Sequence, residues 1–125
     1  MILRHLADHI VKTSPTCGAI HEILRDGECS PNLALAFNIG RTVPHYHTTF
    51  DEIYFVLDGT IDLRLHDPAS ALTTVHRLEA NEVCVITRGI HHEILSASPA
   101  NRLAVITSPR FDMSDEHASE VLNRE

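Results

Sequence analysis

Two histidines and one glutamate, in the stretch from residue 40 to residue 59, have the types and the spacing to bind a metal. His45 and His47 are two positions apart, so in a β-strand their imidazoles point to the same face. Glu52 follows after four residues and opens the apolar run Ile53 to Leu57. We expect this run to be the returning strand of a hairpin, which would bring the carboxylate beside the imidazoles. Two neutral nitrogens and one anionic oxygen suit a divalent transition metal.

A second segment, residues 81 to 96, supplies a fourth candidate ligand. A short apolar strand is expected at Val83 to Ile86, followed by a turn and by His92 at the start of another strand. An isolated H-x-H pair is more often an ordinary part of a strand than a ligand pair, but an acidic residue and a distant histidine favour the metal site. Asp51 is the rival carboxylate. Strand alternation puts Asp51 and Glu52 on opposite faces.

These two segments resemble the two sequence motifs of the cupin superfamily. The first motif is a glycine, an H-x-H pair, an acidic residue and a second glycine, matched by Gly40, His45, His47, Glu52 and Gly59. In the second motif Gly89 and His92 match, whereas Asn81, Thr87 and Ser96 stand where glycine, proline and asparagine are usual. The turn at Asn81 survives the change, because asparagine tolerates the left-handed region better than most residues.

The resemblance implies a fold, a ligand set and a cofactor. The fold is all-β: a double-stranded β-helix, or jelly-roll, forming a small single-domain cupin barrel of the type-2 kind over residues 15 to 110. Residues 1 to 14 are an N-terminal extension, and residues 111 to 125 a C-terminal tail with a short helix. The implied ligands are His45, His47, Glu52 and His92. They would hold one divalent transition metal, and Fe, Mn, Ni, Co, Cu and Zn all suit such ligands.

Alternation of apolar residues predicts the remaining strands. They lie at Ala19 to Arg25, Leu33 to Ile39, Pro44 to His47, Asp51 to Leu57, Ile61 to His66, Thr73 to Leu78, His92 to Ser96 and Leu103 to Thr107. An Asp58-Gly59 pair predicts a hairpin turn. Apolar spacing within residues 1 to 14 favours a helix, although cupins often have there an extra strand that packs on a neighbouring subunit. Ser114 predicts the N-cap of a helix over Asp115 to Leu122.

Composition limits the classes of partner. The chain has 125 residues, of which 43% are hydrophobic, so it suits one domain with one core. Its formal charge of −7 argues against nucleic acid as a partner, because phosphate binding needs concentrated lysine and arginine. Polar residues interrupt the N-terminal apolar positions, and no stretch has the length of a membrane span. Three cysteines without zinc-like spacing indicate reduced thiols and a cytoplasmic protein.

Two functions fit this pattern. An enzyme would chelate a small, oxygen-rich substrate at the metal, for isomerisation, epimerisation or, with iron, a dioxygenase reaction. Glu52 and Tyr54, which share a strand face, are the catalytic candidates, although Tyr54 could be a packing residue. Further polar candidates at the barrel mouth, each with a surface residue as the alternative, are His21, Arg25, His91 and Arg110. The alternative function is a non-catalytic module that binds a small ligand or sugar.

The strand expected at Leu33 to Ile39 also bears on assembly. Both of its faces are mostly apolar, as in a strand that is covered on each side. A barrel this small would otherwise expose a large apolar patch, which monomers avoid. We therefore expect a homodimer.

Overall fold

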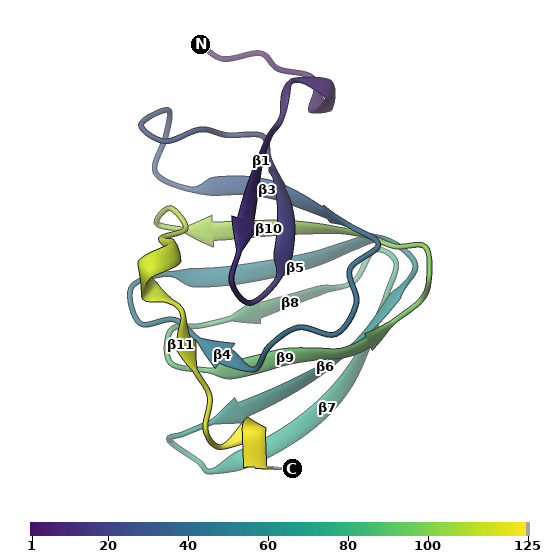
Figure 1. Cartoon of the computed structure of the whole chain (residues 1–125), viewed down its shortest axis with the longest axis vertical. Helices are drawn as coiled ribbons and strands as arrows, with labels where there is room; N and C mark the ends of the chain where they lie inside the picture. The colour runs from purple at the N-terminus through teal and green to yellow at the C-terminus, as the bar shows by residue number, and fades with distance from the viewer. Residues whose placement is uncertain (125) are drawn as a thin grey trace.

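The computed structural model describes residues 1–124, which form two antiparallel sheets that lie face to face (Figure 1). The six-stranded sheet has the order β1 (Ile10–Ser14), β2 (Gly18–Glu22), β3 (Asn32–Phe37), β10 (Arg102–Ser108), β5 (Asp51–Asp58) and β8 (Val83–Ile86). The five-stranded sheet has the order β11 (His117–Ala118), β4 (His45–Tyr46), β9 (His91–Ala97), β6 (Thr60–Asp67) and β7 (Leu72–Glu79). This is a jelly-roll, as predicted, although the hydrogen bonds of the described residues form two separate sheets and not one closed barrel.

The core lies between the two sheets and follows from strand alternation. Along β5, Glu52, Tyr54 and Val56 are buried, while the residues between them are half-exposed. Along β6, Ile61 and Leu63 are almost fully buried. Successive strand residues point to opposite faces, so each sheet contributes every second side chain to this core. Glu52 therefore shares its face with core residues.

The first correction concerns the N-terminal helix. The structure has only a 3-10 turn, η1 (Leu6–Asp8), followed by β1. Leu3 is 89% exposed and Val11 57%, so the apolar spacing does not produce a buried helical face. β1 instead forms a hairpin with β2, from Ile10 opposite Glu22 to Ser14 opposite Gly18. The extra strand that the cupin resemblance implied is therefore present, and it pairs within its own chain.

The second correction concerns the C-terminal helix. The structure has a 3-10 turn, η2 (Met113–Asp115), then β11, then a second turn, η3 (Leu122–Arg124), and among the described residues of the tail there is no longer helix. Tertiary contacts override the local preference, because β11 pairs with β4 and the Asp115 carboxylate is bound by a distant loop. Asp112, not Ser114, caps the first of these turns.

The third correction concerns two hairpins. β4 belongs to one sheet and β5 to the other, so the segment between them crosses from sheet to sheet. The Asp58-Gly59 turn crosses in the same way, between β5 and β6. Gly59 has φ +80°, and a Cβ there would collide with the carbonyl oxygen of Ala100. Glycine is thus required at this motif position. Glu52 still faces the histidines, as predicted, because the two sheets that carry these residues face each other.

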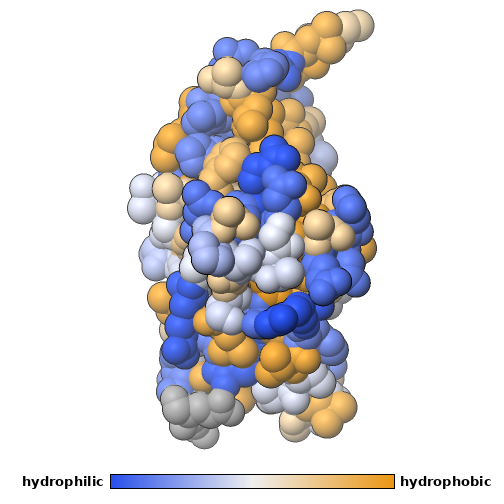
Figure 2. Space-filling model, turned by 90° about the vertical axis from the view of Figure 1, so that its right-hand side faces the viewer, coloured by the Kyte–Doolittle hydropathy of each residue, from blue (hydrophilic) through white to orange (hydrophobic). Residues whose placement is uncertain are grey.

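The surface is mixed in character. The face in Figure 2 alternates hydrophilic and hydrophobic patches without one dominant apolar area. Within residues 1–124, no helix combines the length and the apolar character needed to cross a membrane.

Candidate metal centre

Four buried side chains converge between the sheets. His45 lies on β4, His47 directly after it, Glu52 on β5 and His92 on β9. Each offers one possible ligand atom, and these four atoms all lie within 4.8 Å of one another. His45 is the direct cross-strand partner of His92, while the carboxylate approaches from the opposite sheet. The four residues that the sequence singled out are therefore neighbours in space.

Hydrogen bonds orient the three imidazoles in the same way. The Nδ1 atoms lie 2.6, 2.7 and 3.0 Å from the carbonyl oxygens of Val43, Asp115 and Ile90, for His45, His47 and His92 in turn. A carbonyl oxygen can only accept a hydrogen bond, so each Nδ1 carries the proton. Each Nε2 then keeps its lone pair. This is the tautomer that a metal-binding histidine needs.

The atoms that face one another are acceptors without hydrogen-bond donors. His92 Nε2 lies 3.2 Å from Glu52 Oε1, and His47 Nε2 lies 3.7 Å from Glu52 Oε2. Both of these Nε2 atoms and Glu52 Oε1 are buried and have no hydrogen-bond partner among the described residues. Buried polar atoms without partners are costly. A divalent cation would satisfy all of them, so the donor set fits a metal.

Burial also keeps these groups in their metal-binding protonation states. Burial, assisted by the neighbouring His92, lowers the pKa of His45 to about 3. Burial likewise lowers the pKa of His47. For Glu52 burial alone would raise the pKa, but the surrounding imidazoles outweigh it and hold the pKa to about 2. At neutral pH His45 and His47 are therefore neutral, and Glu52 is ionised.

Comparison with solved structures finds proteins of similar fold. A crystal structure of a protein from Planctomyces limnophilus has a TM-score of 0.75 at 22% identity, over 94% of this chain and 96% of that one. A cupin-2 domain-containing protein from Shewanella frigidimarina has a TM-score of 0.58 at 24% identity, over 73% of this chain and 79% of that one. The chain has the cupin fold. Another match is Pac13, described as a nucleoside dehydratase, with a TM-score of 0.71 at 9% identity, over 95% of this chain and 91% of that one. Neither a family model nor a curated protein matches the sequence.

In this fold the C-terminal tail braces the loop that follows His47. The carbonyl oxygen of Asp115 accepts the Nδ1 proton of His47, and its carboxylate accepts hydrogen bonds from the backbone N–H and hydroxyl groups of Thr48 and Thr49. The ring of Phe50 stacks on His47, with 4.3 Å between the centroids. Sequence spacing gave no signal for Asp115, because it lies 68 positions beyond His47.

The glycine of the second motif contacts the backbone of the candidate ligand His47. Gly89 has φ +85°, and its N–H donates to the carbonyl oxygen of His47 at 2.7 Å. Asn81 has φ +71°, in the left-handed region that its substitution for glycine requires. Asp51 points away from the site, where its carboxylate accepts the backbone N–H of Arg88.

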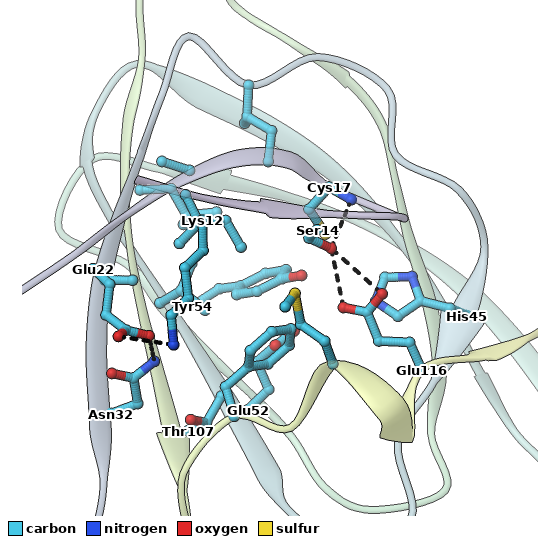
Figure 3. A pocket seen from close by; sticks show the side chains of 18 residues that line it. Lys12, Ser14, Cys17, Glu22, Asn32, His45, Glu52, Tyr54, Thr107 and Glu116 are labelled. Atoms are coloured by element: carbon cyan, nitrogen blue, oxygen red, sulfur yellow. Dashed lines mark hydrogen bonds and ion pairs between the residues drawn. The ribbon is translucent and has the colours of Figure 1, made fainter. Parts of the chain in front are cut away.

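A pocket opens beside the four candidate ligands (Figure 3). Its cavity volume is small, about 30 Å³ for the centre of a water-sized sphere, which is room for only a few water-sized groups. Tyr54 lines it together with His45 and Glu52. Burial, with the charge of Glu52, raises the pKa of Tyr54 well above its ordinary value, so its hydroxyl stays protonated and acts as a hydrogen-bond donor.

The other candidates at the barrel mouth lie outside this pocket lining. His21 packs against the rings of His9 and Phe37, and Arg25 binds the carbonyl oxygen of Asp8. His91 stacks on Tyr46. Arg110 pairs with the buried Glu22, which does line the pocket.

The pocket lining also includes polar residues that were not found from the sequence, among them Thr107 and Glu116. Thr107 is the direct cross-strand neighbour of Glu52, and its buried hydroxyl has no hydrogen-bond partner among the described residues. Strand register could have identified it. Glu116 comes from the C-terminal tail, where no spacing links it to the motifs.

Proposed function

We propose that this protein is a metal-dependent enzyme that acts on a small, oxygen-rich molecule. One divalent transition metal would be held by His45, His47, Glu52 and His92. The observation that carries the proposal is the set of four buried ligand atoms within 4.8 Å of one another. They include an ionised carboxylate and imidazoles, and three of the atoms, His47 Nε2, His92 Nε2 and Glu52 Oε1, have no hydrogen-bond partner among the described residues.

A bound metal would supply Lewis-acid polarisation of adjacent substrate oxygens or, if it is iron, activation of dioxygen. The residues of the chain have their own roles. Glu52 supplies the one negative charge of the ligand set. Tyr54, with its hydroxyl protonated, donates a hydrogen bond to the substrate. The walls of Ala34, Ala36 and Val105 are apolar and narrow the pocket around a small molecule.

An enzyme is favoured over a passive binding module. The pocket is lined by two of the candidate ligands, His45 and Glu52, so a ligand in it would lie beside a metal held there. Pac13, described as a dehydratase, spans almost the same length as this chain, which supports catalysis by a single small cupin domain. Of the possible reactions we favour isomerisation, epimerisation or dioxygenation. The three cysteines are free, which supports a cytoplasmic location.

Elemental analysis of protein purified without chelator tests the metal, with an expected value near one ion per chain. Protein that is metal-free and refuses added Mn, Fe, Ni and Zn would contradict the proposal. Turnover is then sought with hydroxy-ketones, sugars and hydroxy-acids, with and without oxygen, because only a dioxygenase consumes oxygen with its substrate. Glu52→Gln and His92→Ala should lose metal and turnover together, whereas the exposed control His76→Ala should lose neither.

A further inference from the structure

A second acidic side chain faces the metal end of the pocket. Glu116, between η2 and β11, lines the pocket together with His45 and Glu52, and in Figure 3 its carboxylate lies at the end opposite Glu22 and Asn32. Its Oε1 accepts a hydrogen bond from Ser14 Oγ at 3.0 Å, and its Oε2 accepts one from Thr16 Oγ1 at 3.0 Å. These bonds fix the carboxylate in place and leave lone pairs on both oxygens for a ligand.

The charges of the pocket disfavour an anionic ligand. Three carboxylates, Glu22, Glu52 and Glu116, line it, against a single lysine or arginine among the described lining residues, Lys12. Lys12 is already engaged, because its Nζ lies 3.1 Å from Glu22 Oε1. Arg110 pairs with that same oxygen at 3.3 Å. An anionic ligand would therefore be repelled by these carboxylates. Apart from a bound metal, no cation of the described lining is available to offset its charge.

We infer that the substrate is a neutral molecule with a hydroxyl group next to a carbonyl or another hydroxyl, and that Glu116 accepts a hydrogen bond from this hydroxyl. The inference rests on the proposed function and narrows it, because hydroxy-acids and other anionic chelators are excluded in favour of α-hydroxy ketones and vicinal diols. Glu116 meets the substrate directly, so it is a catalytic residue in the reaction classes that move a hydroxyl proton.

The environment of Glu116 suits a group that accepts from O–H. Burial raises the pKa of Glu116, and the nearby Glu52 charge raises it further, while the hydroxyls of Ser14 and Thr16 oppose the shift. A carboxylate with a raised pKa is a stronger acceptor, and it exchanges protons more readily near neutral pH. Of the other carboxylates among the described lining residues, Glu22 is ion-paired and Glu52 is a candidate metal ligand.

The test uses full-length protein loaded with Ni²⁺, its metal content measured first, and two probes titrated by calorimetry. Dihydroxyacetone is a neutral α-hydroxy ketone, and oxalate is a dianion with a similar pair of oxygens. Glu116→Gln should weaken dihydroxyacetone binding about tenfold, the effect of losing a hydrogen bond to a charged group, and should tighten oxalate binding. The exposed Glu120→Gln removes the same charge from the same tail, and should change neither affinity.

A second variant guards against misfolding. Thr16→Val removes one hydroxyl that holds Glu116, so it should weaken dihydroxyacetone binding in the same direction but less. Protein that takes up no metal overturns the proposed function and this inference together. Protein that binds metal normally, but whose Glu116→Gln variant keeps the wild-type affinities for both probes, overturns this inference alone.

Discussion

The Nδ1 atom of His47 lies 2.7 Å from the carbonyl oxygen of Asp115, a residue of the C-terminal tail. The carboxylate of Asp115 also accepts hydrogen bonds from Thr48 and Thr49. Its side chain therefore holds the loop that follows His47, while its backbone carbonyl orients the His47 imidazole. Partners of this kind fix the tautomer and direction of a metal-binding imidazole.

We therefore predict that Asp115→Ala weakens metal binding by about tenfold or more, without removing any ligand. Loss of the carboxylate frees the loop and lets the carbonyl move away from His47. Competition against a chelating dye measures the affinity. Asp112→Ala is the matched control, because Asp112 caps the same turn through Ser114 and does not reach the loop. Equal affinities in the two variants would contradict the prediction.

The metal-free protein should lose stability in mild acid. The folded-state pKa of His45 is about 3, below its unfolded value of about 6.5, so its contribution is fully present above that unfolded value and is lost as the pH falls toward the folded one. At about pH 5 His45 alone should lower the free energy of unfolding by about 2 kcal/mol. The pKa of Glu52 is also lowered, to about 2, so its own effect begins only below its ordinary value, in stronger acid.

Urea unfolding from pH 7.5 to pH 5, with a chelator present, measures this slope. His45→Asn should flatten it, because the variant has no imidazole to protonate, whereas the exposed His76→Asn should leave it unchanged. A wild-type free energy of unfolding that stays constant across this range would show that protonation of these histidines does not oppose folding.

Whether a feature could be predicted from the sequence depended on whether it is set by nearby residues. Strand alternation found Val83 to Ile86 with its observed bounds, and the motif spacing selected the four residues that converge. Sequence patterns failed where contacts between distant residues determine the local structure. Asp115 carries a helix signal, but its carboxylate and carbonyl are committed to residues far away in the chain, and His117 pairs with Tyr46 on β4. Because those contacts join segments far apart in the sequence, no local pattern could show them.

The homodimer remains a prediction, but a different strand now supports it. Leu35 is only 7% exposed within the single chain, so the strand that suggested an interface is already covered. Val83 and Val85, on the edge strand β8, are 57% and 58% exposed and are the better candidates for burial by a partner. Light scattering should give about 28 kDa, twice the chain mass of 13.9 kDa. A mass equal to that of one chain at micromolar concentration would reject it.

The cysteines should differ sharply in reactivity. Burial, assisted by the Glu52 charge, raises the pKa of Cys17 to about 12, and the thiolate is the reactive form. Cys29 is exposed. With metal-free protein at pH 8, iodoacetamide should label Cys29 at least about 100-fold faster than Cys17, as followed by peptide mass spectrometry. Equal rates would show that Cys17 is not shielded in the pocket, and a Cys29→Ser variant isolates the slower reaction.

The last prediction concerns the ion pair that anchors the tail. Glu93 on β9 is fully buried, and its carboxylate pairs with Arg64, its cross-strand neighbour on β6. Arg64 in turn donates to the carbonyl oxygen of Leu122 at 2.7 Å. Glu93→Gln removes this carboxylate from the buried guanidinium, so the free energy of unfolding should fall by about 1.5–3 kcal/mol, the cost of losing a hydrogen bond between charged groups.

The pair Arg77–Asp62, at 2.9 Å, is the control, and Asp62→Asn should lower the free energy of unfolding much less than Glu93→Gln does, because solvent screens surface ion pairs. Replacing both residues, as Arg64→Met with Glu93→Leu, should recover part of the loss, because apolar residues of similar volume need no buried charge. Urea unfolding of the wild type and these three variants gives the free energies of unfolding to compare. If Glu93→Gln is no worse than Asp62→Asn, the pair does not hold the tail against the sheet.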